Sequence, residues 1–366
     1  MTGDSTEQVR VRATYLHREQ VLIETGGGTL VADHSVRLGG DGRGPSAGDL
    51  LAMALDSSTV LNLARVGIPS HSIVSRSAYR NGLLDDSGPM SSLMYMAEIS
   101  QRIDIAADCD EAALAALAAA VDDAPVARAL TSGLKLNESV VLERTSGPRR
   151  LNAHVNQSLR SYIHDAERKI DGALHLTPNE PRWRDHASYL GDGVAMIKHD
   201  HQPYISSAGG AGMGISPQEL LIASLAACTV YFVVHNTGFD EIPFDDVVVD
   251  AVATIDLDGM ILQIDRVATV TGPVSDEEAA KIEYFANHCY IGETMRRGPR
   301  LTRDLVVGQR DEGHEVLSAI AELYTEPTSV PGEGIGCDDG SCCVPQLQSA
   351  GAPSGNAPGV DGASGV

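Results

Sequence analysis

Residues 216–239 read SPQELLIASLAACTVYFVVHNTGF, and this stretch predicts a long helix at the centre of the fold. Ser216 can act as the N-cap, Pro217 suits the first helical position, and Glu219 occupies the capping-box position. The residues that follow are apolar on almost every side, which is typical of a helix buried inside a protein. We therefore expect one central, buried helix here.

A second stretch, SAGDLLAMALDSSTVLNLARVGI at residues 46–68, repeats this pattern. Ser46 aligns with Ser216 and Thr59 aligns with Thr229, and the members of each pair are 170 residues apart. Self-similarity over such a length indicates an internal duplication.

The sequence after each of these helices is also repeated. Alternation of apolar and polar residues predicts strands at residues 94–105 in the first copy and at residues 245–257 and 261–272 in the second. A second helix with an acidic start follows in each copy, and its capping-box pairs are Asp108 with Glu111 and Ser275 with Glu278.

We therefore predict an α+β fold built from two divergent copies of one domain, residues 1–145 and residues 146–327. Residues 328–366 are rich in Gly, Ser, Pro and Ala, a composition that predicts a disordered tail. The insert at residues 178–206 has no clear periodicity, so no element is assigned to it.

Composition and charge restrict the class of partner. The chain has 366 residues and a net charge of −23, which disfavours binding to nucleic acid or to anionic membranes. The apolar run at residues 220–234 is shorter than the roughly 20 residues that a membrane-spanning helix needs. The N-terminus carries no signal-peptide pattern. We expect a cytoplasmic protein without a cofactor.

The chain has six cysteines, too few for a structural disulfide framework in a chain of this length. Taken alone, Cys228 and Cys289 are most simply read as small buried hydrophobic residues. The cysteines of the tail are Cys337, Cys342 and Cys343. They can exchange thiols with a disulfide in the core, or bind a soft metal or an arsenical.

The segment GMGISPQELLIASLAACT resembles the helix signature of the OsmC/Ohr family, and FANHCYIG occupies the place of that family's second cysteine segment. The resemblance implies an intertwined dimer with long central helices packed on antiparallel sheets. In a tandem chain, the two copies would form a pseudo-dimer within one molecule.

The resemblance also implies the roles of the site residues. Cys228 would be the peroxidatic cysteine and Cys289 the resolving cysteine. A nearby cation normally lowers the pKa of a reactive thiol. The family takes this cation from an arginine of the N-terminal hairpin, and Arg18 and Arg168 occupy matching places in the two copies.

Several positions depart from the family pattern. The family's glutamate, ten residues before the reactive cysteine, is Gln218 here, with Glu219 beside it. The first copy has Ser58 opposite Cys228 and Ala124 opposite Cys289, so it lacks both thiols. The first copy is therefore expected to be degenerate and structural.

The resulting hypothesis is a peroxiredoxin-like oxidoreductase. It would reduce organic hydroperoxides with a dithiol reductant, through a Cys228 sulfenic acid and a Cys228–Cys289 disulfide. One alternative is a non-catalytic OsmC-like protein that binds a small molecule. Another is a soft-metal or arsenical handling protein that uses the cysteines of the tail. Further homo-oligomerisation is compatible with all three.

Overall fold

The computed structural model describes residues 6–17, 20–34, 40–67, 73–85, 92–107, 109–145, 185–199, 202–208 and 214–308. Every described residue lies in one compact unit of the chain, Met1–Leu323. The described residues form six helices and twelve strands of a mixed α/β fold.

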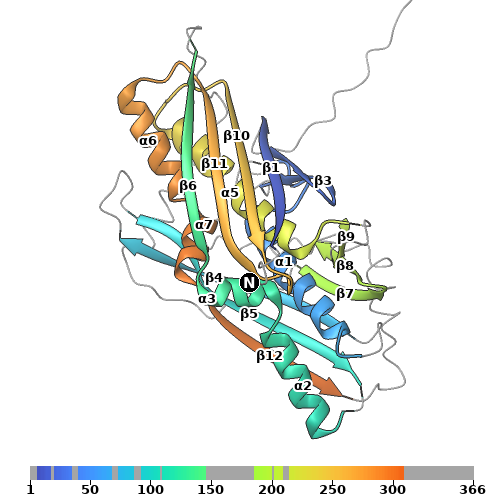
Figure 1. Cartoon of the computed structure of the whole chain (residues 1–366). Coiled ribbons are helices and arrows are strands. Elements are labelled where there is room, and N and C mark those ends of the chain that lie inside the picture. The colour runs from blue at the N-terminus through green and yellow to red at the C-terminus, as the bar shows by residue number, and fades with distance from the viewer. Residues whose placement is uncertain are drawn as a thin grey trace, which may run out of the picture. The chain divides into compact units, whose positions relative to one another are not determined.

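The same order of elements occurs twice along the chain (Figure 1). The first set is β1 (Glu7–His17), β2 (Gln20–Thr25), β3 (Gly28–Asp33), α1 (Ala47–Ala64), β4 (Ile73–Asp85), β5 (Ser92–Ala106), α2 (Glu111–Asp122), α3 (Pro125–Ser132) and β6 (Lys135–Arg144). The second set is β7 (Asp185–Gly191), β8 (Val194–His199), β9 (Gln202–Ser207), α5 (Pro217–Phe239), β10 (Asp246–Ile255), β11 (Ile261–Gly272), α6 (Asp276–Asn287), α7 (Tyr290–Arg297) and β12 (Arg300–Gly308). We refer to these sets as the first half and the second half.

Each of the two sheets combines strands from both halves. One sheet has the order β3-β2-β1-β10-β11-β6 and the other has the order β12-β5-β4-β7-β8-β9. The last strand of each half therefore lies beside a strand of the other half. The strands of the two halves are interleaved, and neither half forms a complete sheet by itself.

The sheets are not wholly antiparallel, which corrects the expectation from the sequence. β6 runs parallel to β11, and β12 runs parallel to β5, whereas the other neighbouring pairs are antiparallel. A parallel neighbour needs a long crossover connection. Here each parallel neighbour comes from the other half of the chain. The duplication and the domain boundaries remain predictions.

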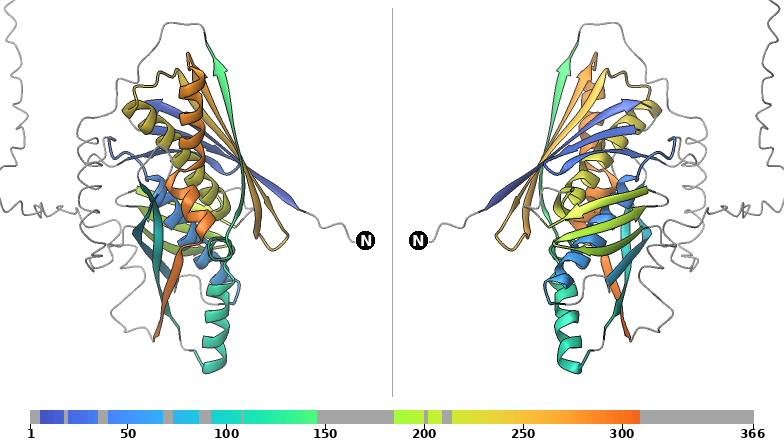
Figure 2. Two further views of the ribbon diagram at one scale, coloured as in Figure 1. Left: turned by 90° about the vertical axis from the view of Figure 1, so that its left-hand side faces the viewer. Right: turned by 90° about the vertical axis from the view of Figure 1, so that its right-hand side faces the viewer.

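The long helices α1 and α5 pack against each other between the sheets (Figure 2). α5 also packs on β1 and β10 of one sheet, and α1 packs on β4 and β7 of the other. The capping box of Ser216 and Glu219 is present at the start of α5, as predicted. α5 is long and apolar enough to cross a membrane, but 83% of its most apolar window is buried inside the protein.

Two local expectations need correction. Residues 178–206 show no clear periodicity in the sequence, but β7, β8 and most of β9 lie within them. Five of the six residues of β8 are buried, so this strand shows no alternation in its sequence. The helix α2 begins at Glu111 and is capped by Asp110, whose side chain accepts the Ala113 N–H, so the predicted Asp108 capping box is wrong.

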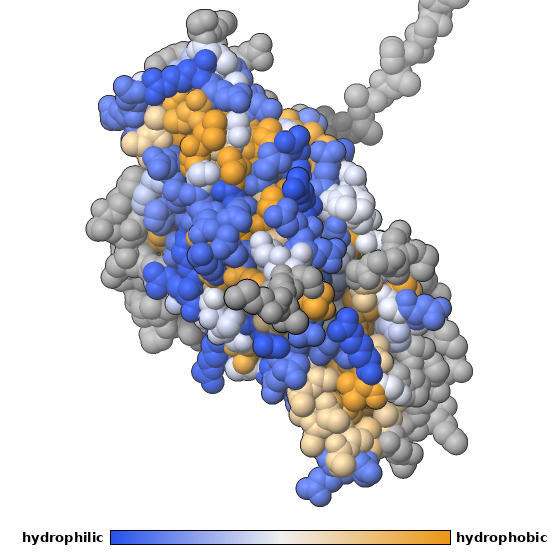
Figure 3. Space-filling view, viewed as in Figure 1, coloured by the Kyte–Doolittle hydropathy of each residue, from blue (hydrophilic) through white to orange (hydrophobic). Residues whose placement is uncertain are grey.

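The surfaces of the two matching helices α2 and α6 differ. The side chains that α2 exposes are mostly alanine, together with Leu114, and they form a hydrophobic area in the space-filling view (Figure 3). The exposed side of α6 instead carries charged residues, including Asp276, Glu277 and Lys281. The two halves thus share an order of elements but not a surface chemistry.

Candidate functional site

Folding brings Cys228 and Cys289 into direct contact, although they are 61 residues apart in the sequence. Cys228 lies about three turns into α5. Cys289 lies in the short connection between α6 and α7, where it is the N-cap of α7. A hydrogen bond joins the two thiols. The backbone N–H of Ile291 also donates to Cys228 Sγ at 3.3 Å.

Cys289 receives more polar contacts than Cys228. The backbone N–H of Gly292 donates to Cys289 Sγ at 3.4 Å, and Arg266 Nη1 donates to it at 3.4 Å. The Thr229 hydroxyl lies 3.5 Å from the same sulfur. Cys289 is 0% exposed and Cys228 is 6% exposed. The site is therefore a buried thiol pair with a guanidinium beside one sulfur.

Arg266 is a strand residue that points into the core. It lies on β11 and is only 2% exposed. Its Nη2 donates to the carbonyl oxygen of Ala286 at 2.6 Å, and its Nη1 donates to the Thr229 hydroxyl at 2.5 Å. It also forms an ion pair with Glu138 of β6. Because Glu138 is directly opposite Arg266 in the parallel pairing of β6 with β11, the first half supplies part of this site.

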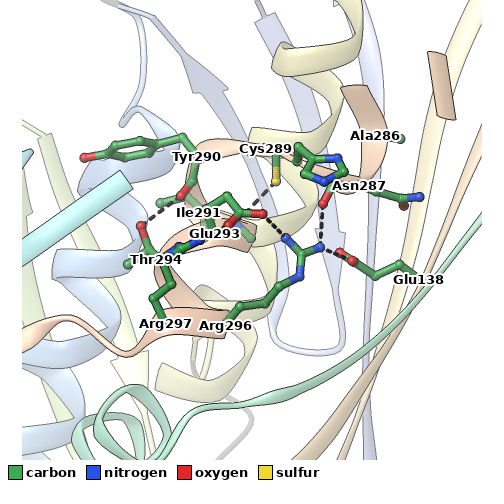
Figure 4. Close-up of polar contacts among 12 residues, drawn as sticks. Glu138, Ala286, Asn287, Cys289, Tyr290, Ile291, Glu293, Thr294, Arg296 and Arg297 are labelled. Carbon is green, nitrogen blue, oxygen red and sulfur yellow. Dashed lines mark hydrogen bonds and ion pairs between the residues drawn. The ribbon is translucent and has the colours of Figure 1, made fainter. Parts of the chain in front are cut away.

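Glu138 also belongs to a wider set of charged residues, which we call the charge cluster: Arg266, Arg296, Arg297, Glu138 and Glu293. Figure 4 shows Glu138, Glu293, Arg296 and Arg297 of this cluster. Glu138 also pairs with Arg296, and Glu293 pairs with Arg296 at 2.5 Å and with Arg297 at 3.4 Å. Arg296 Nη2 donates to the carbonyl oxygen of Asn287 at 2.5 Å. These contacts tie α7 to β6.

The surroundings push the acidities of the two thiols in opposite directions. Burial raises the pKa of Cys228 well above its usual value, and the hydrogen bond with Cys289 raises it further. Burial also opposes ionisation of Cys289. There, however, the hydrogen bond from Cys228 and the charge of Arg266 outweigh burial and lower the pKa to about 5. The geometry therefore favours a Cys228 thiol that donates to a Cys289 thiolate.

The first half contains the equivalent position without the thiols. Ser58 replaces Cys228 and accepts the N–H of Val126 at 3.2 Å, as Cys228 accepts that of Ile291. Ala124 takes the place of Cys289 as the residue that precedes a short helix. Gln101 replaces Arg266, and its Nε2 donates to the Thr59 hydroxyl at 2.9 Å. This position therefore has neither a thiol nor a guanidinium.

Gln218 and Glu219 lie away from the sulfurs. Gln218 is ten residues before Cys228, about 15 Å along the helix axis. It donates to the carbonyl oxygen of Gly259 at 3.0 Å and lines a small hollow together with Ser58. Glu219 caps α5 and also accepts the N–H of Gly27 at 2.9 Å, which ties the β2–β3 turn to the helix.

The remaining predicted site residues all lie outside the part of the chain that the structure describes. They are Arg18, Arg168, Cys337, Cys342 and Cys343, and their roles remain predictions. Cys109 is half-buried and free. Within the described ranges, no group of three or more His, Cys, Asp or Glu side chains is arranged to hold a metal ion.

Two residues of the site, Arg266 and Glu138, are not predicted from the sequence. One signal was available for Arg266, because β11 alternates between buried and half-buried residues and Arg266 occupies a buried position between Ile264 and Ala268. An arginine on the apolar face of a strand needs a buried anionic partner. No local signal identified Glu138, because its role depends on the pairing of β6 with β11.

Residues 209–303 match the family model described as OsmC-like protein. Among solved structures, the chain is similar to a putative osmotic stress induced and detoxification response protein from Psychrobacter arcticus 273-4. The identity is 17%, the TM-score is 0.30, and the match covers 36% of this chain and 99% of that one. It is also similar to a hypothetical protein from Aquifex aeolicus VF5, with 13% identity, a TM-score of 0.27, and coverage of 34% and 95%. No curated protein matches the chain significantly.

Proposed function

Because residues 209–303 match the OsmC-like family model, we propose that this protein is a thiol-dependent peroxidase that reduces organic hydroperoxides with the Cys228–Cys289 pair. The observation that carries the proposal is the hydrogen bond between the two buried thiols, with Arg266 Nη1 3.4 Å from one of them. A disulfide needs two cysteines in contact. Fast thiol chemistry also needs one thiolate held by a nearby cation.

In the proposed reaction, Cys228 attacks first because it is the more exposed sulfur of the pair, and the attacking species is the thiolate that it becomes as it loses its proton. Its sulfur attacks the terminal oxygen of the hydroperoxide, the O–O bond breaks, and the alkoxide leaves and is protonated to the alcohol. The product on the protein is a Cys228 sulfenic acid.

Cys289 then attacks the sulfur of the sulfenic acid. The S–S bond forms, hydroxide leaves and is protonated to water, and the hydroperoxide has been reduced by two electrons from the two cysteines. An external dithiol reduces the disulfide by thiol exchange and restores the pair. Both the hydroperoxide and the dithiol are proposed partners of this protein, and a cytoplasmic location remains an expectation.

The test is a turnover assay with the full chain. With tert-butyl hydroperoxide and excess dithiothreitol, we expect catalytic consumption of one hydroperoxide per dithiol oxidised. The rate should exceed that of the same mixture without protein. The increase should be far larger than the cysteines of the chain would give if they reacted as ordinary thiols. Consumption that ends after less than one equivalent per chain would reject catalysis. In that case, ligand affinity unchanged by Cys228→Ser would favour the non-catalytic binding protein.

A further inference from the structure

The geometry points to Cys289 as the thiolate of the pair, held by Arg266, and to this thiolate as the base that accepts the proton of Cys228 when Cys228 attacks. This inference rests on the proposed function for the role of the base. The location of the charge does not depend on that function and can be measured without any peroxide.

The direction of the hydrogen bonds supports this assignment. Cys289 Sγ faces two donors besides Cys228, namely the Gly292 N–H and Arg266 Nη1, each at 3.4 Å. It also lies at the N-terminus of α7, where the positive end of a helix stabilises an anion. Cys228 lies about three turns inside α5, and besides Cys289 the donor that faces it among the described residues is one backbone N–H, that of Ile291.

The charge balance of the site also supports a thiolate at Cys289. The charge cluster contains three guanidinium groups and two carboxylates, so it carries one excess positive charge. Arg266, the most buried of the three arginines, touches the Cys289 sulfur. Glu138 is shared between Arg266 and Arg296, so a thiolate at Cys289 gives Arg266 a second counter-ion and brings the net charge of the cluster and the thiolate to zero.

The titratable and charged groups that face the pair come from four elements. They are Cys228 on α5, Arg266 on β11, Glu138 on β6 acting through Arg266, and Tyr290, Glu293 and Arg296 on α7.

The equivalent position in the first half provides an internal comparison. Gln101 stands there in place of Arg266 and binds Thr59, as Arg266 binds Thr229. Across the strand pair, Arg303 is opposite Gln101, whereas Glu138 is opposite Arg266. Of the two equivalent positions, the one that carries the thiols therefore has the guanidinium and its carboxylate partner, although that carboxylate, Glu138, comes from the first half.

Each proton is accounted for when Cys228 starts as the thiol and Cys289 starts as the thiolate. Before the reaction the pair consists of a Cys228 thiol and a Cys289 thiolate. As Cys228 attacks the peroxide oxygen, its proton moves along the hydrogen bond to Cys289 and then passes to the departing alkoxide, which leaves as the alcohol. Cys289 is a thiolate again and attacks the sulfenic acid.

The test is a pH titration of the reduced full-length protein labelled with ¹³C at the β-carbons of cysteine, since these chemical shifts report ionisation at each sulfur separately. We expect Cys289 to titrate near its pKa of about 5 and Cys228 to remain a thiol throughout the neutral range. Arg266→Gln, which copies the Gln101 arrangement, should raise the Cys289 midpoint by about 1–3 units because the opposite charge is removed.

Glu138→Gln is the matched variant. It removes a negative charge from the same ion pair, so the Cys289 midpoint should stay unchanged or fall. A rise in both variants would mean that general loosening of the site, and not the charge of Arg266, controls the thiol. Titration of Cys228 below Cys289, or no shift in Arg266→Gln, would overturn the inference. A Cys289 thiolate in a protein without peroxidase turnover would reject the proposed function and leave the charge assignment standing.

Discussion

Replacing Cys228 by serine is expected to lower the rate of organic hydroperoxide reduction on the order of a thousandfold or more. A serine hydroxyl is a far weaker nucleophile than a thiol, and it cannot form a disulfide with Cys289. Serine can still donate a hydrogen bond to the Cys289 sulfur and fits the same space, so the fold should be retained. The measurement is the steady-state consumption of tert-butyl hydroperoxide with excess dithiothreitol.

Cys109→Ser is the matched control, because Cys109 is half-buried, free and not part of the thiol pair. This variant should keep the activity of the parent chain. Cys289→Ser should behave differently from both, since Cys228 can still be oxidised but its sulfenic acid has lost the neighbouring thiol that resolves it. Activity in Cys228→Ser comparable with that of Cys109→Ser would show that Cys228 is not the attacking residue.

Replacing Arg266 by methionine is expected to reduce the free energy of unfolding by about 3 kcal/mol, because breaking a buried ion pair typically costs about 3–5 kcal/mol. The lower end applies since Glu138 keeps Arg296 as a partner. The variant also removes the donor to the Ala286 carbonyl oxygen, which is then left buried without it. Urea denaturation followed by circular dichroism measures the difference.

Arg12→Met is the control for this stability prediction. Arg12 also lies in a strand of the same sheet and pairs with an aspartate, Asp250, at 2.8 Å. Its side chain is 56% exposed, so removing this pair should cost at most about 1 kcal/mol. Equal losses in Arg12→Met and Arg266→Met would contradict the structural importance that we assign to burial of Arg266.

Much of the fold could be predicted from local sequence patterns. The capping boxes at Ser216 and Ser275 and the apolar surface of α5 identify helices by short-range chemistry alone. The strands β10 and β11 alternate because one face of each is buried. The sequence does not predict β8, because nearly all of its residues are buried and polar residues therefore do not alternate with apolar ones.

The interleaving of the halves could not be predicted from local patterns. Arg266 and Glu138 are 128 residues apart in the sequence and meet only because β6 pairs with β11. The family resemblance implies that the two cysteines act together and that their cation comes from the hairpins, at Arg18 and Arg168, which lie outside the described residues. Among the described residues, the cation beside Cys289 is Arg266 of the central strand β11, and its carboxylate partner comes from the half that has no cysteine in the equivalent site.

In the proposed mechanism, folding makes Cys228 and Cys289 a single redox unit. The most direct measurement is peptide mapping by mass spectrometry after the reduced chain has reacted with one equivalent of cumene hydroperoxide and the remaining thiols have been alkylated. We expect a disulfide-linked peptide that contains both Cys228 and Cys289, with Cys109 alkylated. Recovery of Cys228 and Cys289 as two alkylated thiols would contradict it.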